Sequence, residues 1–149
     1  MDAWSLKTEI LSVDQGVEKF FKYNNAFTMK KILIVEDELS LLKLLELTFK
    51  SNDFEVIKAI NAESAYASLS KNPDLILLDV LLPGESGLSI LERIKKDPMY
   101  KKIPVIMLTN FSEPERIEKA KKLGAVDYLI KSSSDPSTVV EKVKEYLGE

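Results

Sequence analysis

Residues 75–79 of this chain have the sequence LILLD, four apolar residues followed directly by a carboxylate. Three further short apolar runs also end at a polar or charged side chain: residues 32–37 (ILIVED), 105–109 (VIMLT) and 128–131 (YLIK). Runs of this length and β-branched content are typical of strands buried on both faces of a parallel sheet. The four runs therefore predict such a sheet, with a reactive side chain at the end of each strand.

Segments of helical periodicity separate these runs, which predicts helical crossovers between parallel strands. We expect strands near residues 31–36, 54–59, 74–79, 104–109 and 126–130. Helices are expected near residues 38–51, 62–71, 87–97, 113–123 and 136–147. The fold class is then α/β, a doubly wound five-stranded parallel sheet with helices on both faces. This domain would occupy residues 29–149.

Local signals support these helix limits. Residues 112–115 (SEPE) match a capping box of the S-x-x-E type. Asp135 would be an N-cap, with Pro136 at the first helical position. Gly124 suits the left-handed residue just past a helix end, and Pro98 would close the helix before it.

Residues 1–28 form a separate N-terminal extension with an amphipathic helical pattern. Its apolar residues are spaced 4-3-4-3, at Leu6, Ile10, Val13, Val17 and Phe20. Three alternatives remain open for it. The helix would pack on its own domain or fray, or it would form a homodimer or dock a partner through residues 4–21. The segment would otherwise reflect an upstream start, since residue 29 is itself a methionine.

Composition narrows the classes of function. The chain has 149 residues, so one domain is expected. Its net charge of −3 gives no sign of the positive charge that nucleic-acid-binding proteins carry. No apolar run approaches the ~18 residues that span a membrane, and no secretory signal is visible, so a cytoplasmic protein is expected. Cysteine and histidine are both absent, which excludes thiolate ligands, histidine ligands and a phosphohistidine on this chain.

Three carboxylates are expected to meet at one edge of the sheet. Ligands of such sheets bind beyond the carboxyl ends of the strands, where Glu36, Asp37 and Asp79 would face one another. Because these charges repel one another, a divalent cation would resolve the conflict. Ligands that are all oxygen favour Mg²⁺, whereas no D-x-[DN]-x-[DN]-G loop supports Ca²⁺. The alternative for Glu36 and Asp37 alone is a solvated start to the next helix.

Asp79 has a different setting from the acidic pair. Residues 80–87 (VLLPGESG) predict a tight loop that leaves its carboxylate exposed at the sheet edge. A carboxylate can act as a nucleophile toward phosphorus, and such a transfer needs positive charge on the phosphoryl oxygens. The metal and Lys131 would supply that charge, and Thr109 would donate a hydroxyl hydrogen bond. A lone threonine or lysine after a strand is usually structural or solvated, but their joint placement favours function.

These motifs resemble the receiver domains of two-component response regulators over residues 30–149. The resemblance rests on the acidic pair Glu36-Asp37, the Asp79-x-x-x-Pro83-Gly84-x-x-Gly87 segment, Thr109, and Tyr128-x-x-Lys131. It implies a flavodoxin-like fold with strand order 2-1-3-4-5. Because nothing similar to an effector domain follows residue 149, a stand-alone receiver like the chemotaxis regulators is expected.

The resemblance also implies the reaction. Asp79 would accept a phosphoryl group from a phosphohistidine on a sensor histidine kinase or a histidine phosphotransfer protein. Glu36, Asp37, Asp79 and the backbone carbonyl of Leu81 would hold Mg²⁺. The absence of histidine agrees, because the donor then lies on another polypeptide.

The remaining implied roles concern the switch. Thr109 and Tyr128 would be the switch pair, and Lys131 the phosphate contact. Phosphorylation adds about −2 charge, so the Thr109 hydroxyl should move toward the phosphoryl group and let the Tyr128 ring turn inward. The output face, formed by the helices expected near 113–123 and 136–147 and the strand between them, would then dock an unknown downstream protein.

Four positions depart from the family pattern. Lys131 is followed by residues 132–134 (SSS), where most members have a proline. Asn110 stands where a very small residue is usual, and its amide is expected to crowd the phosphoryl site and slow entry. Leu81 and Phe111 occupy positions that are often polar. Our hypothesis is that these two apolar groups hinder an attacking water and prolong the phosphorylated state.

Two other classes of protein are alternatives to a receiver. An aspartyl phosphohydrolase commonly carries a D-x-D motif, whereas residues 79–81 are DVL. We therefore expect no enzyme activity beyond self-phosphorylation and self-dephosphorylation. A pseudo-receiver, which is a purely structural interaction module, usually lacks the acidic pair or the acceptor aspartate, and this chain has all three.

Overall fold

The structure, a computed structural model, describes residues 28–149. The amphipathic helix expected in the N-terminal extension, with its segment 4–21, lies outside the described residues. Among the described residues, no helix is long and apolar enough to cross a membrane.

Five parallel strands form one sheet at the centre of the molecule. They are β1 (Lys31–Val35), β2 (Glu55–Ala59), β3 (Leu75–Leu78), β4 (Val105–Thr109) and β5 (Asp127–Ile130). Their order across the sheet is β2-β1-β3-β4-β5, and every neighbouring pair is parallel. This confirms the doubly wound α/β fold and the strand order 2-1-3-4-5.

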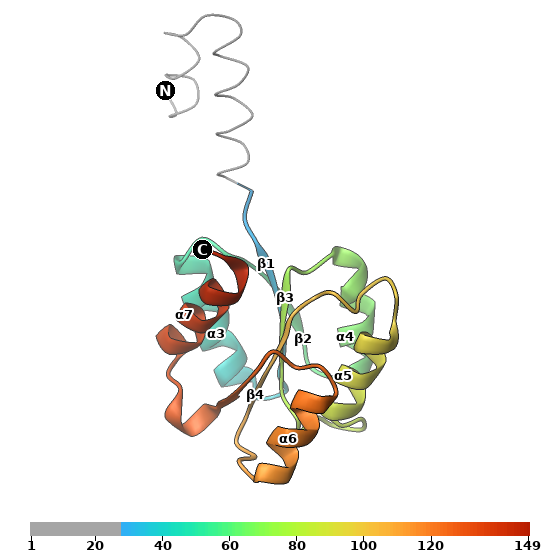
Figure 1. The fold of residues 1–149 in the computed structure, drawn as a ribbon. Coiled ribbons are helices and arrows are strands. Elements are labelled where there is room, and N and C mark those ends of the chain that lie inside the picture. Colours follow the sequence, from blue (N-terminus) through green and yellow to red (C-terminus); the bar gives the residue numbers. More distant parts are fainter. Residues whose placement is uncertain (1–27) are drawn as a thin grey trace, which may run out of the picture.

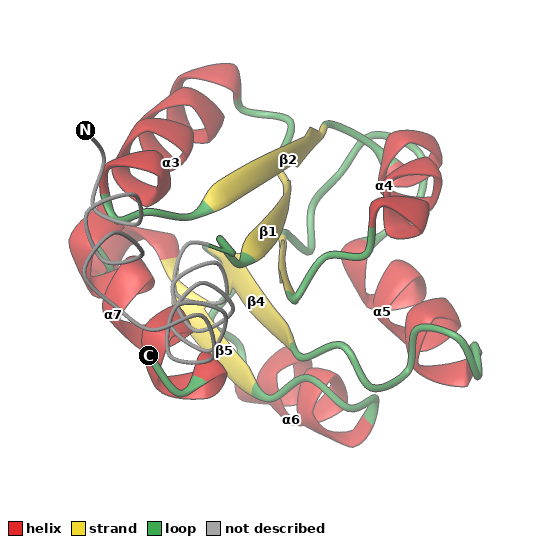
Figure 2. Ribbon diagram, turned by 90° about the horizontal axis from the view of Figure 1, so that it is seen from above, coloured by secondary structure: helices red, strands yellow, loops and turns green. Residues whose placement is uncertain are grey.

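Helices cover both faces of the sheet. They are α3 (Leu39–Ser51), α4 (Ala62–Ser68), α5 (Gly87–Lys96), α6 (Pro114–Lys122) and α7 (Pro136–Leu147), with single 3-10 turns η1 (Leu69–Lys71) and η2 (Lys131–Ser133). Figure 1 and, from above, Figure 2 show α3 and α7 on one face and α4, α5 and α6 on the other. The expected helix at 62–71 divides into α4 and η1, and the other limits agree within one residue.

Two apolar cores lie on either side of the sheet. Along β1, Ile32 and Ile34 pack with residues of α3 and α7, whereas Leu33 and Val35 pack with residues of α4, α5 and α6. All four residues of β3 are at most 1% exposed. Both faces of β3 are covered, which explains why residues 75–78 are all apolar.

The helix ends confirm two of the expected signals and correct a third. The Asp135 side chain accepts a hydrogen bond from the N–H of Thr138 at 2.8 Å, and Gly124 adopts a left-handed φ of 105°. The capping box at 112–115 is wrong, because the N-cap of α6 is Glu113 and makes no side-chain cap bond. Pro114 takes the first helical position and keeps the residue before it extended, which moves the helix start one residue past Ser112.

Candidate functional site

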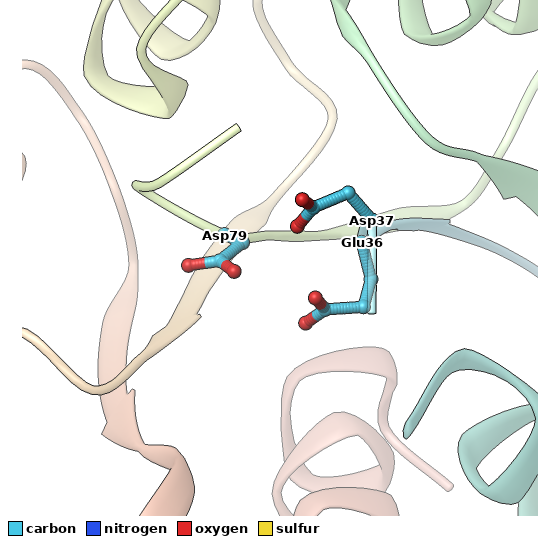
Figure 3. Close-up of side chains that lie close together, drawn as sticks. All are labelled: Glu36, Asp37 and Asp79. Atoms are coloured by element: carbon cyan, nitrogen blue, oxygen red, sulfur yellow. The ribbon is translucent and has the colours of Figure 1, made fainter. Parts of the chain in front are cut away.

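Three carboxylates meet where β1 and β3 end. Val35 and Leu78 are paired across the sheet, so the residues that follow them, Glu36 and Asp79, leave the two strands side by side. One oxygen from each of Glu36, Asp37 and Asp79 lies within 4.8 Å of the others. Figure 3 shows the acidic pair on one segment and Asp79 on its neighbour. The structure thus brings together the three residues that the sequence predicted to meet.

Burial distinguishes the three carboxylates. Glu36 is 2% exposed and Asp79 is 5% exposed, whereas Asp37 is open to solvent. The expectation of an exposed Asp79 is wrong, because the loop after it and the Lys131 side chain cover its carboxylate. The Leu81 N–H donates to Asp79 Oδ1 at 3.2 Å, while residue Leu81 is itself 65% exposed.

Lys131 bridges two of the carboxylates. Its Nζ lies 2.6 Å from Glu36 Oε1 and 2.6 Å from Asp79 Oδ2, and only 12% of its side chain is exposed. Burial by itself lowers the pKa of the ammonium, but its hydrogen bonds to Asp79 and Glu36 outweigh burial and raise that pKa above the usual value. Burial raises the pKa of Glu36, although the bond from Lys131 opposes this. Lys131 therefore stays charged and screens two carboxylates that would otherwise repel each other.

The loop between β3 and α5 needs two of its glycines. A side chain at Gly87 would place its Cβ 1.8 Å from the carbonyl oxygen of Asp79, which no residue but glycine avoids. Gly84 has a φ of 85°, in the left-handed region that favours glycine. Farther along, the Glu85 carboxylate accepts a 2.7 Å hydrogen bond from the Tyr66 hydroxyl, which anchors the loop to α4. The loop that covers Asp79 is thus held at both ends.

Thr109 and Tyr128 are connected through the backbone of Phe111. The Thr109 side chain is buried at the end of β4, and its Oγ1 accepts a 3.4 Å hydrogen bond from the Phe111 N–H. The Tyr128 hydroxyl donates a 2.6 Å bond to the Phe111 carbonyl, and its half-buried ring packs against the core. Burial raises the pKa of the Tyr128 hydroxyl, so it remains a donor. Arg116 lies over the Phe111 ring at 4.1 Å.

Asn110 makes a contact that the sequence did not suggest. Its Oδ1 accepts a hydrogen bond from the Ser132 N–H at 3.1 Å, which directs the side chain toward the loop after β5. This bond, like the Tyr66–Glu85 bond, joins residues distant in the chain, and no motif signals either of them. The Lys131 contact to Glu36 was also missed, since the expected role of this lysine was toward phosphate.

Comparisons with known proteins identify one family. The sequence profile of the response regulator receiver domain matches residues 32–144. The chain is 37% identical over 119 residues to the phosphate regulon transcriptional regulatory protein PhoB of Pseudomonas aeruginosa, covering 79% of this chain and 52% of that protein. It is 35% identical over 119 residues to sporulation initiation phosphotransferase F of Bacillus subtilis, covering 79% and 94%. The Mn²⁺-bound form of response regulator Rcp1 is a structural neighbour with a TM-score of 0.70 and 30% identity, covering 79% and 94%.

The chain belongs to the family of response regulator receiver domains, the signalling domains of two-component systems that histidine kinases phosphorylate on an aspartate. It spans about half the length of the curated PhoB relatives it matches. PhoB proteins are named as transcriptional regulators, and only their receiver part corresponds to this chain.

Proposed function

We propose that Asp79 is the phosphoacceptor, receiving its phosphoryl group from a sensor histidine kinase or a histidine phosphotransfer protein. The observation that supports this is the placement of its carboxylate at the end of β3, where it contacts the Lys131 ammonium and lies within 4.8 Å of the acidic pair. Glu36 meets the same ammonium and belongs to the same cluster, so it is the Asp79-x-x-x-Pro83-Gly84-x-x-Gly87 segment after β3 that favours Asp79 as the acceptor.

The transfer itself is a displacement at phosphorus. An Asp79 carboxylate oxygen forms a bond to phosphorus while the bond from phosphorus to the donor imidazole breaks, and the imidazole nitrogen keeps the electron pair. Lys131 already lies 2.6 Å from Asp79 Oδ2, so its ammonium is in reach of the incoming phosphoryl oxygens. Self-dephosphorylation is the attack of water on the same acyl phosphate.

The acidic cluster fits Mg²⁺ by the chemistry of its donors. Glu36, Asp37 and Asp79 offer oxygens within 4.8 Å of one another, with no nitrogen or sulfur ligand. Hard oxygen ligands of this kind suit Mg²⁺, and the backbone carbonyl of Leu81 would complete the protein's contribution. When bound, the ion supplies positive charge beside the phosphoryl oxygens. The Mn²⁺-bound neighbour supports a divalent cation in this fold.

The switch is proposed to act through Thr109 and Tyr128. Both already contact the backbone of Phe111, so a shift of the Thr109 hydroxyl toward the phosphoryl group would move the loop that Tyr128 holds. A change of population from 1:99 to 99:1 needs about 5.5 kcal/mol of differential stabilisation. The face of α6, β5 and α7 would then dock a downstream protein target.

The extent of the family match, residues 32–144, supports a division of the chain into two parts. We infer a receiver domain at 29–149 and an N-terminal extension at 1–28, with residues 4–21 as the candidate homodimer segment. A cytoplasmic location suits a receiver that meets a kinase, and the net charge of −3 favours a protein partner over nucleic acid. Sedimentation of the full chain against one that starts at Met29 tests the dimer.

Intact-mass measurement tests the phosphoacceptor. With Mg²⁺ and a small phosphodonor, we expect an adduct of one phosphoryl group, lost in Asp79→Asn and retained in Asp127→Asn at the other end of the sheet. Rapid turnover of the donor without an adduct would indicate a phosphohydrolase, and inertness would indicate a pseudo-receiver. Chelation of Mg²⁺ should abolish the adduct. Acid should weaken Mg²⁺ binding, because burial raises the pKa of Glu36 above its ordinary value of 4.5 and a protonated carboxyl is a poor ligand.

A further inference from the structure

The side chain of Asn110 links the two loops that follow Thr109 and Ile130. Its Oδ1 accepts the 3.1 Å hydrogen bond from the N–H of Ser132, across 22 positions of sequence. Within residues 28–149, this is the one hydrogen bond between the loop after β4 and the loop after β5. It therefore joins the segment that carries the buried hydroxyl to the segment that carries the bridging ammonium.

The loop after β5 has few other restraints. Residues 132–134 are three serines, and the bonds within the turn are long: Ser134 N–H to the Lys131 carbonyl and Ser133 Oγ to the Ile130 carbonyl each measure 3.4 Å. No side-chain cap bond starts η2. The bond from Asn110 is shorter than either, and it acts on the peptide N–H directly after Lys131.

This position determines what the bond can control. The Lys131 ammonium must reach Asp79 from the end of β5, and its side chain is only 12% exposed, so its backbone origin limits where the charge lies. Ordering a long lysine side chain costs conformational entropy. A restraint on the adjacent peptide reduces the number of positions that the Lys131 ammonium can take. A short amide fixed by one bond is well suited to this, because asparagine has few rotatable bonds.

We propose that Asn110 is a positioning residue for Lys131. By holding the Ser132 N–H, it orients the lysine ammonium toward the phosphoryl group that forms on Asp79. This inference rests on the proposed function of Asp79. The sequence suggested instead that the Asn110 amide crowds the phosphoryl site, which predicts the opposite effect on the rate of phosphorylation. If Asn110 obstructs the site, its removal accelerates phosphorylation; if it positions Lys131, its removal slows phosphorylation.

The test compares the full chain with Asn110→Ala and with Ser132→Ala. The second variant is the control, because it keeps the backbone N–H and removes only the serine hydroxyl. With acetyl phosphate and Mg²⁺, we expect phosphorylation of Asn110→Ala to be slower by about threefold to tenfold, the range given by loss of one hydrogen bond. Affinity for beryllofluoride, a phosphoryl mimic, should fall by a similar factor, while the melting temperature falls by only a few degrees.

A spectroscopic readout follows the bond itself. In Asn110→Ala the Ser132 amide proton should move upfield and exchange faster, and Asn110→Asp, which keeps the acceptor oxygen, should restore both. A phosphorylation rate of Asn110→Ala equal to or above that of the wild type would overturn the inference. So would an equal loss in Ser132→Ala. If the wild type itself forms no phosphoryl adduct, the function proposed for Asp79 fails, whereas failure of Asn110→Ala alone leaves that function intact.

Discussion

Replacing Lys131 by methionine should destabilise the protein and make its stability depend on Mg²⁺. The ammonium lies 2.6 Å from both Glu36 and Asp79, whose side chains are 3% and 5% exposed. Its removal leaves two buried carboxylates without a counter-charge, and breaking a buried ion pair in this way costs about 3–5 kcal/mol. For a domain of this size the melting temperature should fall by about 10–20 °C.

The pH dependence of this loss has a definite sign. Burial already raises the pKa of Glu36, and without the opposing bond from Lys131 it should rise further. A carboxyl with a raised pKa in the folded state binds its proton more tightly there, so stability increases as the pH falls from neutral through that pKa. The deficit of Lys131→Met should therefore be largest at pH 7 and smaller near pH 5.

Urea unfolding at both pH values, with and without MgCl₂, measures these effects. Mg²⁺ should raise the midpoint of Lys131→Met more than that of the wild type, because in the variant the ion is the only positive charge at the cluster. Lys96→Met is the control, since Lys96 is 76% exposed in a surface pair that contributes little. A variant with the wild-type midpoint at pH 7, or an equal deficit at both pH values, would refute the reasoning.

Three further outcomes are expected. Three lysines contact the Glu46 carboxylate. They lower its pKa to about 2, and the hydrogen bond from Lys50 is the largest cause. Glu46→Gln should thus lose about 1 kcal/mol at pH 7, and a deficit that does not shrink as the pH falls from 4.5 toward 2 would contradict this. Gly87→Ala should lose about 1–3 kcal/mol in urea unfolding, because its Cβ would overlap the Asp79 carbonyl; a wild-type midpoint would show that the loop relaxes freely. Leu81→Asn and Phe111→Glu should shorten the half-life of the phosphorylated form by admitting water, and an unchanged or longer half-life measured by intact mass would dismiss that hypothesis.

The sequence alone was sufficient for the fold and for the membership of the acidic cluster. The run at 75–78 could be identified as a central strand because burial on both faces requires continuous hydrophobicity. Parallel strands all end at one edge, so an acidic residue after each of two runs had to lie there. The capping box at 112–115 failed because two local signals competed, and the preference of Pro114 for the first helical position prevailed over the cap at Ser112.

Only the tertiary structure decided how the side chains of the site are held. The burial of Asp79, the bridge from Lys131 to Glu36 and the bond from Asn110 to Ser132 each depend on how far one loop lies from another. Periodicity and caps are set by neighbours within a few residues, so they can be recognised in the sequence. Contacts across 22 or more positions depend on packing between elements, and no local pattern records which atoms that packing brings within hydrogen-bonding distance.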